Sequence, residues 1–177
     1  MKTLITIATA LTLLLSTAAL ADKTAGETVD DSVIQAELKT KLMGDNFFKG
    51  LGINIEVRKG VAQLGGFVDD AQLATDAART AAGVKGVVEV DNQLHLKEGK
   101  ASMGRVVDDK VVTTKVKSEL GHIGSGSSLF KVNVDTYNGV VLLTGFVDSE
   151  EIKGKVGELA EGTDNVTKVI NGIHVLD

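Results

Sequence analysis

Hydrophobic residues change their spacing along the chain, and these changes predict a series of short elements. Residues 30–44 carry one apolar stripe at the spacing of an amphipathic helix: Ile34, Leu38 and Leu42. Residues 53–58 then alternate between apolar and polar side chains, as a half-buried strand does. The dipeptide Lys59-Gly60 separates this strand from a second one over residues 61–68. The pattern predicts a helix followed by a β-hairpin with a two-residue turn.

A second helix and a third strand follow the hairpin. The helix carries a stripe of small and apolar residues: Leu73, Ala77, Thr80 and Ala81. Gly83 stands where a helix C-cap is preferred, and the final strand runs through residues 87–96. The predicted order is helix, strand, strand, helix, strand.

The same order occurs twice. The tetrapeptide Gly-Phe-Val-Asp at residues 66–69 returns at 145–148, 79 positions later. The aspartate pair Asp30-Asp31 is matched by Asp108-Asp109, and one inserted residue separates the two registers. Further matched pairs reach the C-terminus: Gly60/Gly139, Leu64/Leu143, Gly83/Gly162, Val90/Val169, Asn92/Asn171 and His95/His174. Self-similarity of this extent indicates a duplicated structural unit.

We therefore predict an α+β fold of two repeated α-β-β-α-β domains, each a three-stranded mixed sheet with two helices on one face. The predicted domains span residues 30–97 and 106–177, joined by a linker over residues 98–105. Residues 22–29 form a short N-terminal tail.

We interpret the repeated Gly-Phe-Val-Asp as a strand-to-helix corner and not as a catalytic site. Gly66 and Gly145 fall on the apolar face of the second strand, where a glycine lets a neighbouring backbone come close. Asp69 and Asp148 follow, each three residues before a Gln or Glu, which is the pattern of a helix capping box. We expect these four residues to shape the backbone.

Two such units, each with an acidic helix start, this corner and a final strand carrying Val-x-Asn, resemble the tandem BON-domain family of osmotically inducible periplasmic proteins. The resemblance covers nearly all of the chain after residue 29. It implies a periplasmic location, induction by osmotic or envelope stress, and a role at phospholipid surfaces or as a chaperone-like binder. The family has no catalytic residues to assign to this chain.

The first 21 residues have the parts of a secretory signal peptide. Met1-Lys2 supplies a positive charge, residues 4–15 are apolar apart from threonines, and Ala19 and Ala21 have the small-x-small spacing of a cleavage site. The apolar run is too short to span a bilayer as a mature helix. We predict cleavage after Ala21 and export to the periplasm; an uncleaved membrane anchor is the alternative.

Composition narrows the classes of partner. The chain contains no cysteine, so disulfides and thiolate chemistry are excluded. Its net charge of −5 opposes binding to nucleic acid, which depends on neutralising phosphates. Tryptophan is absent and aromatic residues are few, so stacking platforms for bases or sugars are not expected. We predict no nucleic-acid partner, and no small-molecule substrate is evident.

Residues that could carry catalysis have simpler interpretations. The carboxylate pairs, including Asp30-Asp31 and Asp108-Asp109, fall at predicted helix starts, where they complement the helix dipole. The segment GHIGSGSS at residues 121–128 lacks the strand-loop-helix order and the closing lysine of a phosphate-binding loop. We predict no enzymatic activity, no cofactor and no metal site.

His95 and His174 stand at equivalent positions of the two copies. If the domains pack about a pseudo-twofold axis, the two imidazoles could meet as metal ligands or as a pH sensor. No further ligands occur at a recognisable spacing, so we interpret both as exposed strand residues.

The second strand of each copy has another face that needs a cover. Helices cover only one side of each sheet, and a domain of about 60 residues is marginally stable alone. The uncovered faces are mixed in the first copy and largely apolar in the second: Val61, Gln63, Gly65 and Phe67 against Val140, Leu142, Thr144 and Phe146. We expect the two domains to dock through these faces; a partner-binding surface is the alternative.

The first helix of the second copy carries a candidate interaction surface. Val111 lies off the buried stripe, and Lys110 and Lys117 lie together on an outer face, a small version of the pattern of membrane-surface helices. Val33 repeats the off-stripe valine in the first copy. A first-turn staple or an interdomain contact is the interpretation that we favour from the sequence. Lys110, Val111 and Lys117 are nevertheless the candidates for a lipid or partner surface.

The sequence as a whole therefore predicts a non-catalytic periplasmic protein of the envelope or osmotic stress response that binds phospholipid surfaces. The alternative is a chaperone-like binder of unfolded or partner proteins in the periplasm.

Overall fold

The computed structural model describes residues 29–44, 52–100, 103–123 and 131–176, and these form two α-β-β-α-β units. The first unit contains α1 (Asp31–Gly44), β1 (Asn54–Arg58), β2 (Val61–Val68), α2 (Ala71–Ala82) and β3 (Glu89–Leu96). The second contains α3 (Met103–Ile123), β4 (Lys131–Tyr137), β5 (Val140–Val147), α4 (Glu150–Glu161), β6 (Lys168–Asn171) and β7 (His174–Val175). The predicted α+β repeat is confirmed. The predicted signal peptide and most of the glycine-rich segment lie outside the described residues.

Both sheets are mixed, as predicted. In each domain the hairpin strands pair antiparallel, and the strand after the second helix pairs parallel with the central strand. The second sheet differs from the prediction because its last strand is divided. β6 and β7 pair with the same strand, β5, on either side of Gly172-Ile173, so this sheet has four strands instead of three.

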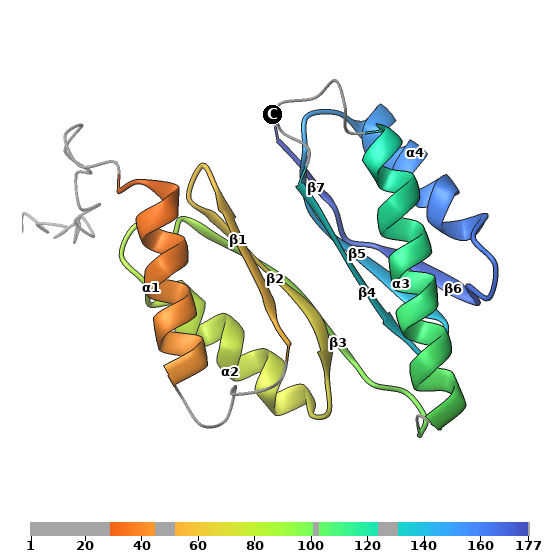
Figure 1. The fold of residues 1–177 in the computed structure, drawn as a ribbon. Helices are drawn as coiled ribbons and strands as arrows, with labels where there is room; N and C mark the ends of the chain where they lie inside the picture. Colours follow the sequence, from red (N-terminus) through yellow and green to blue (C-terminus); the bar gives the residue numbers. More distant parts are fainter. Residues whose placement is uncertain (1–28, 45–51, 101–102, 124–130, 177) are drawn as a thin grey trace, which may run out of the picture.

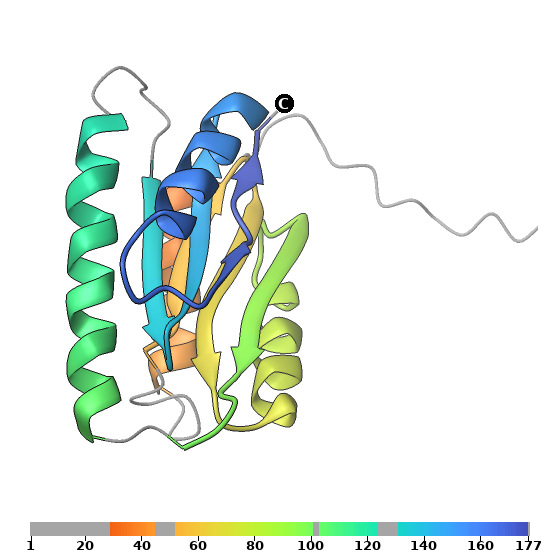
Figure 2. The ribbon, with the colours of Figure 1, turned by 90° about the vertical axis from the view of Figure 1, so that its right-hand side faces the viewer.

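The two sheets face each other in the middle of the molecule, and the helices lie outside them. Figure 1 shows α1 and α2 on the outer side of the first sheet and α3 and α4 on the outer side of the second. Figure 2 views the second domain from outside, with α4 in front of its sheet. The molecule is therefore a four-layer stack in which each sheet is covered on both faces.

Each domain has its own hydrophobic core between its helices and its sheet. The predicted stripe of α1 is buried against β1 and β2, together with Ala77 and Ala81 of α2. The equivalent positions of the second domain are buried in the same way: Val112, Val116, Leu120, Val156 and Ala160. Helical periodicity therefore predicted both cores correctly.

Both hairpins turn through left-handed residues. Lys59 and Gly60 have φ of 48° and 77°, and Asn138 and Gly139 have φ of 50° and 78°. Two successive residues with positive φ make the turn whose twist matches antiparallel strands, and asparagine and glycine accept this conformation most readily. The predicted two-residue turns are confirmed.

One aspartate from the first helix of each domain holds the hairpin turn. The carboxylate of Asp31 accepts hydrogen bonds from the backbone N–H groups of Lys59 and Gly60 at 2.8 and 2.9 Å. The carboxylate of Asp109 accepts the equivalent bonds from Asn138 and Gly139 at 2.9 and 2.8 Å. Each bond pair ties a helix to a turn almost thirty residues away.

These contacts correct the interpretation of the aspartate pairs. Asp30 is the residue that caps α1, because its carboxylate accepts a bond from Ser32 N–H at 2.7 Å. In the second domain the helix begins at Met103, inside the predicted linker, so Asp108-Asp109 does not stand at a helix start. The second aspartate of each pair therefore binds the turn; Asp31 also lies in the first turn of α1, as predicted, whereas Asp109 lies inside α3.

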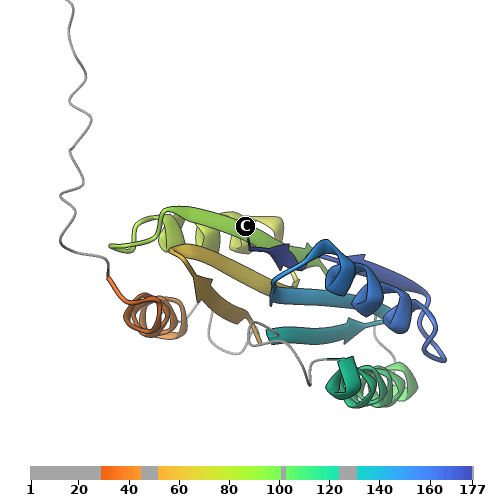
Figure 3. The ribbon, with the colours of Figure 1, turned by 90° about the horizontal axis from the view of Figure 1, so that it is seen from above.

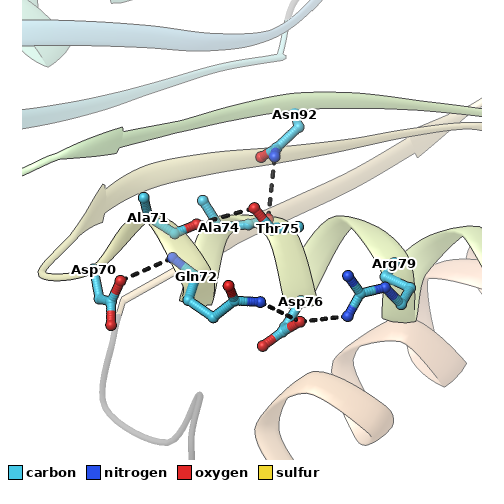
Figure 4. A network of polar contacts seen from close by, with 8 residues as sticks. All are labelled: Asp70, Ala71, Gln72, Ala74, Thr75, Asp76, Arg79 and Asn92. Carbon is cyan, nitrogen blue, oxygen red and sulfur yellow. Dashed lines mark hydrogen bonds and ion pairs between the residues drawn. The ribbon is translucent and has the colours of Figure 1, made fainter.

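The helices after the corners are capped one residue later than predicted. Asp70 caps α2 through a bond from Gln72 N–H, and Ser149 caps α4 through a bond from Ile152 N–H (Figure 4 shows the first). Asp69, predicted to be the cap, instead pairs with Lys97 at 3.0 Å. The capping-box interpretation of Asp69 and Asp148 is wrong. Each of these residues lies between the end of the strand and the residue that caps the helix.

The repeated asparagine of the last strand fixes the second helix. Asn92 donates to the carbonyl oxygen of Ala74 in α2 at 3.1 Å (Figure 4), and Asn171 donates to that of Lys153 in α4 at 2.9 Å. The two pairs occupy equivalent positions in the repeat. This contact explains why Val-x-Asn appears in both copies.

The corner glycines are required by the backbone. Gly66 and Gly145 have φ of 143° and 123°, a region that side chains rarely adopt. A Cβ atom on Gly145 would also overlap the carbonyl oxygen of Lys131 in the adjacent strand. The close approach of a neighbouring strand, expected from the sequence, is therefore present at this corner.

We predict that Gly145→Ala lowers the free energy of unfolding by at least about 2 kcal/mol, because it adds both a steric overlap and backbone strain. Gly154→Ala is the matched control: nothing lies near the added methyl group in exposed α4, so this change should stabilise by up to about 1 kcal/mol. Urea unfolding followed by circular dichroism measures both. Equal changes in the free energy of unfolding would show that the backbone does not require glycine at position 145.

Candidate functional site

The inner faces of the two sheets pack against each other, as expected from the sequence. Leu142, Thr144 and Phe146 of β5 are buried, and so is Gln63 of β2. Thr144 lies against Gly65, its equivalent in the first copy, so closely that a Cβ on Gly65 would stand 2.6 Å from the Thr144 hydroxyl oxygen. Docking of the domains is confirmed, and the alternative of a free partner-binding face is wrong.

A second pair of equivalent positions also meets. Gly172, between β6 and β7, lies against the side chain of Gln93 on β3, and a Cβ there would be 2.6 Å from Gln93 Oε1. At both meeting points, therefore, a glycine of one domain accepts a larger side chain of the other. Each contact joins residues at equivalent positions of the two copies, so the interface has approximate twofold symmetry. The two residues that meet at each contact nevertheless differ in size.

Gln63 supplies the polar centre of this interface. The side chain is 1% exposed, and its Oε1 accepts a bond from the backbone N–H of Gly145. Its Nε2 donates to the carbonyl oxygen of Gly172 at 2.9 Å and to the carboxylate of Asp91 at 2.7 Å. Both partners on the second domain are backbone groups. Gly145 has a positive φ within β5, and Gly172 lies between β6 and β7. Gln63 thus satisfies groups that would otherwise be buried without partners.

One edge of the interface brings β1 and β4 together through charged and polar pairs. Lys131 forms an ion pair with Glu56 at 2.7 Å, and Asn54 donates to the carboxylate of Asp135 at 2.5 Å. Burial raises the pKa of Asp135 to about 6, although the nearby charge of Lys117 and the bond from Asn54 both lower it. Asp135 is consequently an interface carboxylate that changes charge in mildly acidic solution.

The two histidines do not meet. His174 lies 3.4 Å from the Asp91 carboxylate and contacts the ring of Phe146, with 5.4 Å between ring centroids. His95 lines a cavity together with Phe67 and Tyr137, and its Nε2 is buried without a hydrogen-bond partner in the described part of the chain. Both are partly buried, which corrects the expectation that they are exposed. Among the described residues no group of three or more histidines and carboxylates could hold a metal ion.

The candidate residues on α3 lie on the outside of the molecule. Val111 is 47% exposed, its counterpart Val33 on α1 is 55% exposed, and Lys110 and Lys117 are exposed as well. The expectation that the two valines serve as a staple or an interdomain contact is wrong. Lys117 also lies close enough to Asp135 to affect its pKa, so its role is not confined to the outer surface.

Two further exposed residues, Met43 at 54% and Val106 at 42%, extend this feature along the same helices. α1 packs on β1 and α3 packs on β4, and these strands lie at the same edge of the two sheets, as Figure 3 shows from above. We call these four residues, Val33, Met43, Val106 and Val111, the outer apolar surface. No described helix is both long enough and apolar enough to cross a bilayer.

The sequence placed Gln63 on the docking face without a hydrogen-bonding role, and it assigned no role to Asp91 or Asp135. Gln63 interrupts an apolar face, and its counterpart in the second copy is Leu142, which is the signal that could have drawn attention to it. Asp135 alternates with apolar residues at a position where a solvent-facing side chain is expected, so nothing in the strand pattern marks it.

The repeated architecture and its contacts define a protein made of two BON domains: residues 30–98 and 108–177 each match the BON domain family. Osmotically-inducible protein Y of Escherichia coli (strain K12) is 32% identical over 149 residues, which cover 84% of this chain and 74% of that protein. The 21 kDa hemolysin of Actinobacillus pleuropneumoniae is 31% identical over 152 residues, covering 84% and 77%. The chain therefore belongs to the tandem BON-domain family of osmotically-inducible protein Y.

A solved structure, the C-terminal domain of CdsD of the Type III secretion system of Chlamydia trachomatis, matches 84% of this chain and 68% of that chain at 18% identity. The TM-score is 0.34, and this likeness carries no argument about function.

We predict that Gln63→Leu lowers the free energy of unfolding by at least about 2 kcal/mol, because it leaves the buried N–H of Gly145 and carbonyl of Gly172 without partners. Gln72→Leu, on the exposed surface of α2, is the matched control and should change stability by less than about 0.5 kcal/mol. Urea titration measures both. A neutral Gln63→Leu would show that the interface does not depend on this side chain.

We predict that Asp135→Asn becomes increasingly stabilising, relative to the natural chain, as pH rises through the window from about 4 to 6. A carboxyl whose pKa is raised from 3.8 to about 6 on folding gives its full contribution to stability below pH 4 and loses it as pH rises past 6. The substituted amide does not titrate, so the difference in unfolding free energy between the two chains should grow by about 2 kcal/mol between pH 4 and pH 7.

The control for this titration is Asp164→Asn. Asp164 is an exposed residue whose side chain pairs with Lys115 at 3.4 Å. Its substitution should leave the pH profile close to that of the natural chain. If the profiles of Asp135→Asn and Asp164→Asn coincide, Asp135 is not the titrating group.

Proposed function

We propose that this chain is a non-catalytic protein of the bacterial periplasm that binds phospholipid surfaces through α1 and α3 and acts in the response to osmotic stress. The observation that carries the proposal is the outer apolar surface. Of the six large hydrophobic side chains that are exposed in the described residues, four lie on these two helices.

The physical reason is that α1 and α3 are apolar on two faces. Their inner stripes are buried in the domain cores, yet Val33, Met43, Val106 and Val111 face solvent. Each of these two helices therefore presents two exposed apolar side chains to solvent in addition to its buried stripe, and exposed apolar groups on a helix are a feature of interfacial helices. The free energy falls when water-exposed apolar groups enter the boundary between headgroups and acyl chains.

Exposed positive charges on α1 and α3 favour a phospholipid surface over a protein as the partner. Lys39 on α1 and Lys110 and Lys117 on α3 are exposed on the same helices. A lysine near an anionic membrane surface contributes about 1 kcal/mol to binding, even when the whole protein is acidic. Apolar side chains flanked by lysines are the combination that interfacial helices use.

The relatives are compatible with this proposal. One is named for its induction by osmotic stress, and another is named as a hemolysin. The periplasmic location rests on the signal peptide predicted from residues 1–21 and on the family resemblance. Chaperone-like binding is less well supported, because the sheet faces that could have formed a client surface are occupied by the other domain.

We predict that the double substitution Val33→Asn and Val111→Asn weakens co-sedimentation with phosphatidylglycerol-containing vesicles about tenfold or more, because each valine loses about 1 kcal/mol of apolar burial. Lys110→Glu should weaken binding to the same vesicles, and raising the salt concentration should reduce its effect. Lys110 is preferred to Lys117 because Lys117 also acts on Asp135.

Val88→Asn is the matched control for the valines. Val88 is 58% exposed, like Val33, but it precedes β3 instead of lying on the outer helices. Its substitution should leave vesicle binding unchanged. If Val33→Asn with Val111→Asn binds as well as the natural chain, and that chain suppresses aggregation of a denatured protein without lipid, the chaperone-like function replaces the lipid function.

A further inference from the structure

A cavity lies beside the interface, between the end of β3 and the second domain. Its volume is about 130 Å³. The first domain supplies half of the lining residues, Phe67, His95, Leu96 and Glu98, and the second domain supplies the others, Tyr137, Val140, Lys168 and Ile170. We propose that this cavity binds a small monocarboxylate that carries a hydrophobic group about the size of a benzene ring.

The polar side of the cavity lacks an anionic partner. Lys168 is exposed and has no ion pair among the described residues, and its charge is near enough to His95 to lower the pKa of that imidazole. Burial of His95 is the larger cause of its lowered pKa, and a lowered pKa favours the neutral ring. A neutral imidazole with its proton on Nε2 is a donor, and this nitrogen is buried with no partner in the described residues. Because Nε2 is closed to solvent, Lys168 is the group on this side that a ligand carboxylate would pair with, while the His95 ring forms part of the wall.

Two aromatic rings line one side of the cavity. Phe67 and Tyr137 stand with 5.8 Å between their centroids at an angle of 37°, and aliphatic side chains complete the wall. Tyr137 donates its hydroxyl proton to the carbonyl oxygen of Gly99 at 2.9 Å, so its ring is held in place. An apolar cavity of about 150 Å³ accommodates benzene, which places a single ring or a short alkyl chain within range.

Glu98 limits the charge of the ligand. This carboxylate lines the cavity, and its backbone carbonyl is fixed by a bond from the Asn138 side chain at 2.8 Å. Its charge repels an anionic ligand in proportion to the ligand's charge, so a carboxylate is disfavoured less than a phosphate dianion. The charges of Lys168 and Glu98 sum to zero, so a carboxylate must pair with Lys168 on the side of the cavity away from Glu98.

The position of the cavity links binding to domain docking. Its lining is divided between the domains, so a ligand contacts both only when they are packed together. Any ligand that binds the docked form alone stabilises that form in proportion to its concentration. This site is separate from the outer apolar surface, and the inference does not depend on the proposed lipid function.

Benzoate, benzyl alcohol and benzylamine are matched probes, because they share one ring and differ in charge. Isothermal titration calorimetry on the natural chain should give a benzoate dissociation constant on the order of 1 mM, a value in keeping with so few atoms. Benzyl alcohol should bind at least about fivefold more weakly, and benzylamine should not bind measurably. Equal binding of benzoate and benzylamine overturns the proposal.

Lys168→Gln should weaken benzoate binding about tenfold, since it removes the charge-assisted hydrogen bond. Lys110→Gln is the matched control and should leave benzoate affinity unchanged while it weakens vesicle binding. Unaltered benzoate affinity in Lys168→Gln overturns the carboxylate site, whatever the vesicle result.

A third measurement separates direct contact from a general effect of the substitution. The imidazole nitrogen and proton resonances of His95 should shift on benzoate addition in the natural chain, and those of His174 should not. A shift confined to His174, or no shift at saturation, contradicts the proposed site. A thermal scan of each variant without ligand shows that the fold is retained.

Discussion

Face-to-face packing of the two sheets is the constraint on which the other features of the molecule depend. Each sheet carries helices on one side only, so a single domain would leave residues such as Leu142 and Phe146 in water, and both are almost completely buried here. The duplicated domain supplies the missing cover. Because the inner faces are used in this way, α1 and α3 are directed outward, and whatever apolar residues their outer faces carry remain available to another partner.

The features that depend on local pattern were predictable from the sequence. The helical stripes, the two-residue turns, the corner glycines and the choice of inner face each follow from spacing or from backbone conformation. Asp31 and Asp109 were not predictable, because an aspartate in a pair near a helix start can serve the helix or a distant turn. Only the folded distance between that helix and the hairpin decides which. The strands end where they were predicted to end, and the caps were displaced by one residue because Asp69 and Asp148 each lie between the strand and the residue that caps the helix.

The residues of the interface were harder to predict than the fold. Asp135 alternates correctly for a solvent-facing position of a strand, and Gln63 is a polar residue on the face expected to dock; the burial of both arises from the other domain. Periodicity describes one element at a time, so it carries no information about what covers that element. The candidate surface on α3 was identified from helical geometry alone, and its exposure follows from the same geometry, since Val111 lies well off the buried stripe.

The glycines at the meeting points of the domains have a consequence for self-association. A duplicated module could pair with its own kind in another molecule as easily as with its neighbour in the chain. Here two first domains would set Gly65 against Gly65 and Gln93 against Gln93, leaving a void and a collision, while two second domains would oppose two threonines at one point and two glycines at the other. Because the two copies have diverged at these positions, each domain is complementary to the other domain of its own chain. Pairing between two identical domains is thereby disfavoured.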